Sequence, residues 1–247
     1  MKRSVSLLVF LALFYTLIAL SVSADEVTQN LESVIIENFD DPNARQWNVQ
    51  ASKFVADGLP LVTYAESYPE ALFGRNNQGL DLKVLGVKAA YDRKGYNYLE
   101  IYPVEEDSSG VLVPDPITLP GRVMQFDLWV WGSNYDFYIE VHLRDYVGRM
   151  HVLQLGELQY VGWRNLKTVI PPYVPQAGGY ISEGGFLKTL ELVKLVIWTK
   201  PTENVNGFNV YLDQLKILTD TFVSRFDGDD LADPEKVNDI WASAGGN

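Results

Sequence analysis

The sequence predicts an all-β protein, an antiparallel β-sandwich with long loops and a short helix near the C-terminus. Residues 123–175 read as consecutive strands in which apolar and polar side chains alternate. Glycine, proline, asparagine and aspartate separate the strand-like runs. Apolar residues at helical spacing, Val237, Ile240 and Trp241, occur close to the C-terminus.

Residues 1–24 have the pattern of a cleaved secretory signal peptide. Lys2 and Arg3 precede an apolar run at residues 5–20, and small residues follow up to Ala24. The run is short for a membrane span, which needs about 20 apolar residues. We expect cleavage after Ala24, so that the mature protein is not embedded in the membrane.

Composition excludes several classes of function. The net charge of −12 argues against nucleic acid, because phosphates are bound by lysine and arginine. The chain has no cysteine, which excludes disulfides, thiolate catalysis and cysteine-based metal sites. Stability must therefore come from burial and strand pairing.

The first half predicts three strands separated by loops, at residues 31–39, 47–55 and 96–102. An Asp-Asp-Pro-Asn turn follows the first strand, and Leu99 and Ile101 point inward in the third. Glycines, including Gly86, indicate a loop-rich stretch between residues 58 and 95. Residues 105–116 are acidic and rich in proline and serine, and we expect an exposed loop there.

Residues 123–131 predict a strand with one apolar face, formed by Met124, Phe126, Leu128 and Val130. Period two places Trp129 and Trp131 on the opposite side, exposed or under a second layer.

Residues 135–144 predict the next strand, which a turn at residues 145–148 joins to a hairpin partner. A left-handed Gly148 gives a three-residue loop with a bulge. We prefer the register that sets Val141 opposite Leu153 and Ile139 opposite Leu155, because it keeps the apolar face continuous.

The register of this hairpin also determines on which face each of the two histidines lies. The preferred register places His142 and His151 on opposite faces, whereas a register with Glu140 opposite Leu153 makes the histidines face each other and could hold a metal with Glu140. We therefore predict no metal site.

Three further strands are expected at residues 163–170, 189–199 and 208–218. The second is apolar on both faces, as in a central strand. In the third, the inward phase changes after Leu212, which predicts a bulge near Asp213 and Gln214. Residues 25–221 are expected to form one domain.

Residues 222–247 predict an acidic tail with a short amphipathic helix that begins near Asp233 and Pro234. The helix either packs on its own domain or docks on a neighbour. The aspartates at 227–230 resemble a calcium loop only loosely, and a solvated acidic tether is the preferred interpretation.

Catalytic motifs are scarce. The sequence has no Gly-x-Ser-x-Gly elbow and no glycine-rich phosphate loop, and we predict no catalytic residue and no cofactor. Trp129, Trp131, Tyr135 and Tyr138 could stack on sugar rings, contact a partner protein, or serve as core or second layer.

Several segments together carry a family resemblance: residues 129–135, 141–148, 162–166, 170–171, 174–176 and 226–231. They resemble the outer-layer (sheath) protein of spirochaete periplasmic flagella, the FlaA family, over most of the mature chain. A wider resemblance, carried by residues 37–40, Trp47, Gly162-Trp163 and residues 211–215, is to galactose-binding-like jelly-roll domains, which implies two packed antiparallel sheets.

The resemblance implies a structural subunit in the periplasm that binds the flagellin core, other sheath subunits and its own copies. It would change filament shape, stiffness and motility. The alternative is an exported carbohydrate-binding module, and a hydrolase comes third. The candidate interaction surface comprises Trp129, Trp131, Asn134, Tyr135, Tyr138, Trp163, Arg164 and Trp241.

Overall fold

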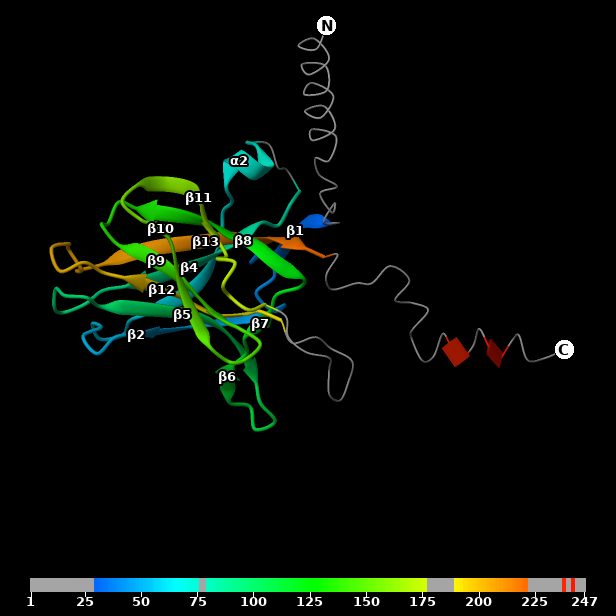
Figure 1. Cartoon of the computed structure of the whole chain (residues 1–247). Helices are drawn as coiled ribbons and strands as arrows, with labels where there is room; N and C mark the ends of the chain where they lie inside the picture. The colour runs from blue at the N-terminus through cyan, green and yellow to red at the C-terminus, as the bar shows by residue number, and fades with distance from the viewer. Residues whose placement is uncertain (1–28, 76–78, 177–188, 222–236, 239–240, 243–247) are drawn as a thin grey trace, which may run out of the picture.

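Two antiparallel sheets pack face to face, which confirms the predicted all-β sandwich (Figure 1). The computed structural model describes residues 29–75, 79–176, 189–221, 237–238 and 241–242. Sheet A contains β1 (Leu31–Glu37), β3 (Leu61–Glu66), β4 (Lys83–Ala89), β8 (Arg122–Ser133), β11 (Val161–Val169) and β13 (Phe208–Asp220). Sheet B contains β2 (Gln46–Ala51), β5 (Tyr98–Glu106), β6 (Leu112–Pro114), β7 (Ile117–Thr118), β9 (Tyr138–Arg144), β10 (Met150–Glu157) and β12 (Glu191–Trp198).

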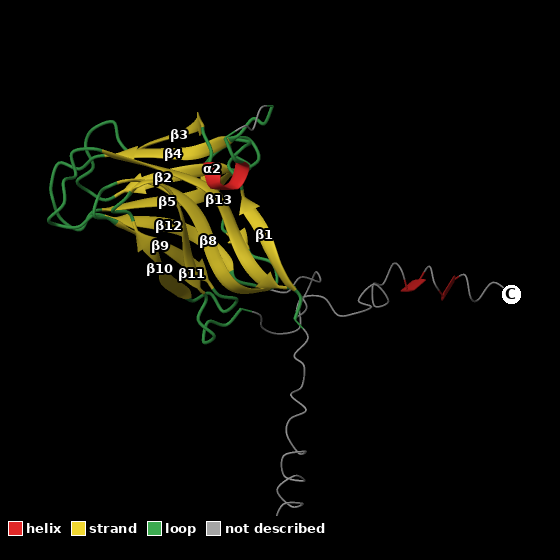
Figure 2. Cartoon of the chain, turned by 90° about the horizontal axis from the view of Figure 1, so that it is seen from above, coloured by secondary structure: helices red, strands yellow, loops and turns green. Residues whose placement is uncertain are grey.

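The chain crosses repeatedly between the sheets. Sheet A has the strand order β11-β8-β13-β4-β3, with β1 paired to the second half of β13. Sheet B has the order β10-β9-β12-β5-β2, so β12 is central, as its two apolar faces predict. The short helix α2 (Glu70–Phe73) lies on the outer side of sheet A, away from sheet B (Figures 1 and 2).

The core lies between the inner faces of the two sheets. Phe126, Leu128 and Val130 of β8 are fully buried, and so are Ile139 and Val141 of β9. Alternation along each strand delivers these side chains to one face. A chain without cysteine depends on this apolar burial and on the backbone pairing within each sheet.

Met124 does not belong to the core face, contrary to the prediction. It is 37% exposed, whereas its neighbour Val123 is completely buried. The pairing of β8 with β13 shifts between Leu218 and Thr219, so Met124 is the extra residue of a β-bulge. A shift of one residue exchanges the two faces of a strand.

The β9–β10 hairpin follows the preferred register over most of its length. Leu153 pairs with Val141 as predicted, and Gly148 is left-handed, with φ 89°. The prediction for Ile139 is wrong, because a bulge after Gln154 places Gly156 opposite it. A β-carbon on Gly156 would lie 3.1 Å from Leu166 Cδ2, so the leucine occupies the space that glycine leaves.

Two predicted loops contain strands. The stretch from 58 to 95 holds β3, α2 and β4, and Gly86 lies inside β4, paired with Tyr211. A β-carbon there would stand 3.0 Å from the Tyr211 ring, so this glycine marks close packing and not a loop. Within residues 105–116, β5 extends to Glu106 and pairs with β6 as a hairpin.

The bulge in β13 is confirmed. The pairing of β13 with β8 shifts between Asp213 and Lys216, and Gln214 has a positive φ of 48°. The phase change along the sequence therefore reflects a real interruption of the ladder.

The signal peptide, the 227–230 aspartates and most of the tail lie outside the described residues. Residues 237–238 and 241–242 have helical backbone, and the rest of the predicted C-terminal helix lies outside the described residues. None of the helices in the described part of the chain is long and apolar enough to cross a membrane.

Replacing Gly132 by alanine should destabilise the fold by about 1–3 kcal/mol, because the added β-carbon would meet the Tyr160 carbonyl oxygen at 2.7 Å. Gly95→Ala is the matched control, since no atom lies within 4 Å of its β-carbon position. Urea unfolding of both variants checks the prediction. Equal midpoints for Gly132→Ala and the wild type would contradict it.

Candidate functional site

The outer face of sheet A carries a row of aromatic side chains that runs across three strands. Trp163 of β11 pairs with Trp131 of β8, and Trp131 pairs with Tyr211 of β13. The Trp131 and Tyr211 rings meet edge to face, with centroids 5.6 Å apart and an interplanar angle of 78°. We call Trp163, Trp131 and Tyr211 the aromatic row. Gly86 continues the line into β4 and makes room for the Tyr211 ring.

The next line of the same face holds Asn165, Trp129 and Asp213. The indole Nε1 of Trp129 is buried without a hydrogen-bond partner among the described residues, and so is Oδ1 of Asn165. Asn165 Nδ2 donates to Asp127 Oδ1 at 2.8 Å. Trp129 therefore packs among its neighbours at the centre of the face, whereas Trp163 lies on the edge strand β11.

Asp213 is a buried carboxyl group, only 1% exposed. Burial raises the pKa of Asp213 to about 7, with a further contribution from the nearby carboxylate of Asp40. The backbone N–H of Gln214 donates to Asp213 Oδ1 at 2.7 Å, and this bond opposes the rise. The carboxyl group thus holds a proton up to near-neutral pH at the bulge of β13.

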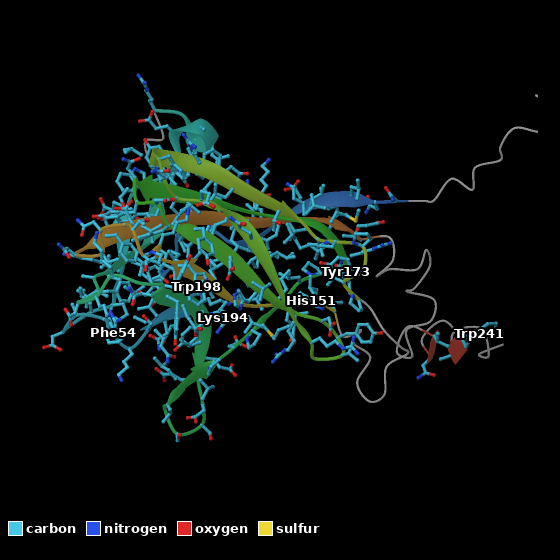
Figure 3. All side chains as sticks on the ribbon, turned by 60° about the vertical axis from the view of Figure 1, so that its left-hand side comes forward. Phe54, His151, Tyr173, Lys194, Trp198 and Trp241 are labelled. Carbon is cyan, nitrogen blue, oxygen red and sulfur yellow. The ribbon has the colours of Figure 1, made fainter. Side chains whose placement is uncertain are left out.

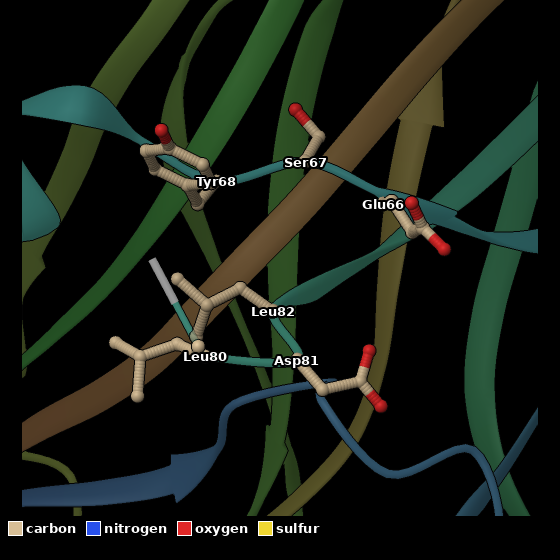
Figure 4. Close-up of a pocket in the computed structure, with 7 residues that line it drawn as sticks. Glu66, Ser67, Tyr68, Leu80, Asp81 and Leu82 are labelled. Carbon is tan, nitrogen blue, oxygen red and sulfur yellow. The ribbon is translucent and has the colours of Figure 1, made fainter. Parts of the chain in front are cut away.

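An open pocket of about 540 Å³ lies beside this face (Figure 4). It is lined by Glu66, Ser67, Tyr68, Gly79, Leu80, Asp81 and Leu82. Its described lining offers two carboxylates and a serine but no histidine to activate a nucleophile.

Apolar side chains extend the outer face of sheet A beyond the aromatic row. Val161 lies two residues from Trp163 on β11 and is 72% exposed. Ile35 on β1 and Val169 at the end of β11 are also exposed. The face is therefore apolar at both ends of the strands.

The outer face of sheet B differs from that of sheet A in the charged side chains that pair with one another across it. Lys194 Nζ lies 2.5 Å from Glu100 Oε1, and Arg144 Nε lies 2.6 Å from Glu191 Oε2. Trp198, on the same strand as Lys194, donates its indole N–H to a carboxylate of the face (Figure 3). The outer face of sheet B thus combines paired charges with the aromatic rings of Tyr98, Trp198 and Tyr138.

The structure brings three of the eight predicted surface residues together: Trp129, Trp131 and Trp163. Tyr135 is partly buried and packs against the core, since its ring stacks on Phe137 at 5.2 Å and its hydroxyl donates to the Gly207 carbonyl.

The remaining predicted residues lie elsewhere. Tyr138 lies on the outer face of sheet B, where burial and Glu140 raise its pKa. Asn134 is an exposed turn residue with φ 64°. Arg164 is exposed, with its guanidinium 4.3 Å above the Tyr160 ring, and Trp241 is 70% exposed in the helical tail residues.

Tyr211 is absent from the predicted surface, although the sequence contains a signal for it. The inward phase of this strand includes Leu212, and Val210 two residues before it shares that phase, so Tyr211 between them must point outward; both neighbours are buried. What the sequence does not disclose is that Trp131 and Trp163 lie on adjacent strands of the same sheet.

The two histidines lie on opposite faces, as the preferred register predicts. His142 is paired with Val152 and lies 3.3 Å from Glu140, whereas His151 bonds Asp145 at 2.8 Å. Over the described residues, no group of three or more His, Asp or Glu side chains is arranged to hold a metal ion.

Comparison with known proteins identifies a family. The model for the flagellar filament outer layer protein FlaA matches residues 15–227. A flagellar filament outer layer-like protein of Brachyspira hyodysenteriae is 23% identical over 206 residues, which cover 83% of this chain and 86% of the relative.

Solved structures with a similar fold include carbohydrate-binding modules. A module of the β-sandwich superfamily has a TM-score of 0.44 at 11% identity and covers 78% of this chain. The match spans 63% of that module's chain, which is less than two thirds. The family 11 module of Clostridium thermocellum has a TM-score of 0.37 at 8% identity and covers 78% of this chain and 96% of its own. These similarities concern the fold alone.

Asp213→Asn should change the pH dependence of stability. Between pH 4 and about 7 the folded chain keeps a proton that the unfolded chain has released, so the wild type loses stability as the pH rises through this window. The variant lacks this loss and should be more stable above pH 7 by about 2–4 kcal/mol. Urea unfolding from pH 4 to 8 measures the difference, with the exposed Asp57→Asn as a charge-matched control. Parallel curves for the wild type and Asp213→Asn would refute the assignment.

Proposed function

Because the chain belongs to the FlaA family of flagellar filament outer layer proteins, we propose that it coats the flagellin core of a periplasmic flagellum. The family is structural and not enzymatic, and membership implies a location on the flagellar filament. The finer proposal is that the subunit binds the core through the outer face of sheet A. A coat thickens the filament, and a thicker rod bends less easily, so that the subunit changes filament shape, stiffness and motility.

The contrast between the two outer faces is the observation that carries this proposal. Protein interfaces have an apolar centre that is depleted of charge and enriched in aromatic residues. The aromatic row and Val161 supply such a surface on sheet A. On sheet B, ion pairs such as Lys194–Glu100 already satisfy the charged groups. We therefore assign the core-binding surface to sheet A, with Trp131 and Trp163 as its anchors.

The predicted signal peptide at residues 1–24 supports a periplasmic location. Other sheath subunits and further copies of the chain are the additional partners. Repeated contacts between copies extend such a coat along the core.

Carbohydrate binding is the second candidate function, and the structure favours a different site for it than Trp131. Tyr138 and Tyr98 flank Trp198 across the outer face of sheet B, and Trp198 Nε1 donates to Glu140 at 2.8 Å. Aromatic rings beside a fixed carboxylate suit a sugar ring and its hydroxyl groups.

Co-sedimentation with purified core filaments tests the coat. Val161→Asp should weaken binding roughly tenfold or more, because it places a charge in an apolar interface. Val152→Asp is the matched control, since Val152 is also an exposed valine of the outermost strand but lies on sheet B. A protein that never pellets with core filaments would remove the proposal, and equal losses in both variants would remove the assignment to sheet A.

A glycan array tests the second candidate. If the chain is a carbohydrate-binding module, Trp198→Ala should abolish binding, because it removes the stacking ring, and Trp131→Ala should leave binding intact. Absence of any binding by the wild type would eliminate this function, and loss only with Trp131→Ala would move the site to sheet A.

A further inference from the structure

The outer face of sheet A has a second apolar region at the end where β1 begins and β13 ends. Its exposed members are Leu31 at 50%, Ile35 at 54%, Met124 at 37% and Val169 at 65%. Val169 and Leu218 flank Gln125 in one cross-strand line, and Leu218 pairs with Ser33 between Leu31 and Ile35. We call these five apolar residues the aliphatic patch.

Two lysines next to the aliphatic patch have no ionic partner. Lys167 of β11 and Lys216 of β13 lie on either side of Asp127 in one line of the sheet. Neither ammonium is within 4.0 Å of a carboxylate in the described part of the chain, and Asp127 accepts a hydrogen bond from Asn165. Two lysines thus stand against the single carboxylate of Asp127 in this line, so the surface beside the patch combines exposed apolar side chains with a small excess of positive charge.

The C-terminal segment, residues 222–247, leaves β13 beside this patch, because Asp220 pairs with Leu31. Its charge is negative: five aspartates and one glutamate stand against Arg225 and Lys236. Val237, Ile240 and Trp241 follow at the spacing that places them on one side of a helix. The segment thus offers an apolar stripe with acidic surroundings, which complements the patch in both respects.

None of the described residues covers the exposed members of the aliphatic patch, and Trp241 of the same chain is 70% exposed. Tyr173, 74% exposed, lies at the same end of the sandwich, whereas Trp241 stands away from it (Figure 3). An exposed tryptophan and an exposed aliphatic surface each gain by leaving water. Exchange of the segment between copies covers both.

We propose that the C-terminal segment of one copy docks on the aliphatic patch of the next copy. Trp241, Ile240 and Val237 cover the aliphatic side chains, and Lys167 and Lys216 face the carboxylates of the segment. The contact is heterologous, so each added copy presents a new patch and a new segment, and a row of subunits grows. This inference rests on the proposed function, because it supplies the contact between neighbouring subunits of the coat.

Sedimentation velocity tests the docking of the C-terminal segment between copies. The sample is the mature protein purified from the cells that export it. The wild type should self-associate as concentration rises, and less so at high salt, which screens the lysine–carboxylate attraction. Trp241→Ser and Ile35→Asp should each weaken self-association roughly tenfold or more. Val152→Asp, on sheet B, is the control and should behave as the wild type.

Mixing the variants distinguishes exchange between copies from docking within one chain. Trp241→Ser keeps an intact patch, and Ile35→Asp keeps an intact segment. An equal mixture should therefore form heterodimers and no larger species, because each heterodimer has no working patch or segment left. If Ile35→Asp fails to fold, the double variant Lys167→Glu, Lys216→Glu takes its place. A wild type that stays monomeric, single variants that associate like the wild type, or a mixture that stays monomeric would each overturn the inference.

Co-sedimentation of the wild type with core filaments separates the two proposals. Wild-type protein that pellets with filaments but does not self-associate refutes the exchange and leaves the coat standing. Protein that self-associates through its segment but never pellets refutes the coat and leaves the exchange standing.

Discussion

Sheet A depends on the backbone pairing of a single strand. β13 bonds β8 along one side, and along the other it bonds first β4 and then β1. The bulge at Asp213 and Gln214 marks the change from one partner to the next. It also divides the outer face, because the aromatic row lies on the half that β4 completes and the aliphatic patch on the half that β1 completes. One irregular position in one strand thus separates two surfaces of different chemistry.

Alternation in the sequence is sufficient to predict the strands and most of the core, because a half-buried strand repeats every two residues. β8 and β9 are recognisable in this way, and so is the bulge of β13. The same logic fails at Met124, where one inserted residue reverses the faces without changing the composition. It also fails at β4, where Gly86 suggests a loop until the Tyr211 ring is seen above it. Both errors arise from neighbours that are distant in the sequence.

The candidate surface could be predicted only in part, for a related reason. The two-residue alternation along a strand shows that Trp129 and Trp131 lie on the same side of it. It does not show which sheet the strand joins. In the sequence, Tyr138 and Trp131 are both aromatic residues on the side of a strand opposite its apolar face. In the structure they lie on opposite outer faces of the sandwich. Tyr135 is aromatic and close to both in the sequence, yet its ring stacks on Phe137 and packs against the core. Tyr211 comes from the far end of the chain and completes the row.

The pairing of β1 with β13 joins segments that lie 190 residues apart, as the bond from the Asn30 N–H to Asp220 shows. The first strand of the domain has its partner at the end of the last one, so sheet A cannot close before nearly the whole domain has emerged. The strands of sheet A that are synthesised first therefore keep their apolar faces exposed until β13 is available to pair with them. Any copy cut short before β13 loses the partner of three strands at once and never acquires either surface. Formation of sheet A therefore requires the whole of β13, and a chain that ends before this strand cannot form the aromatic row or the aliphatic patch.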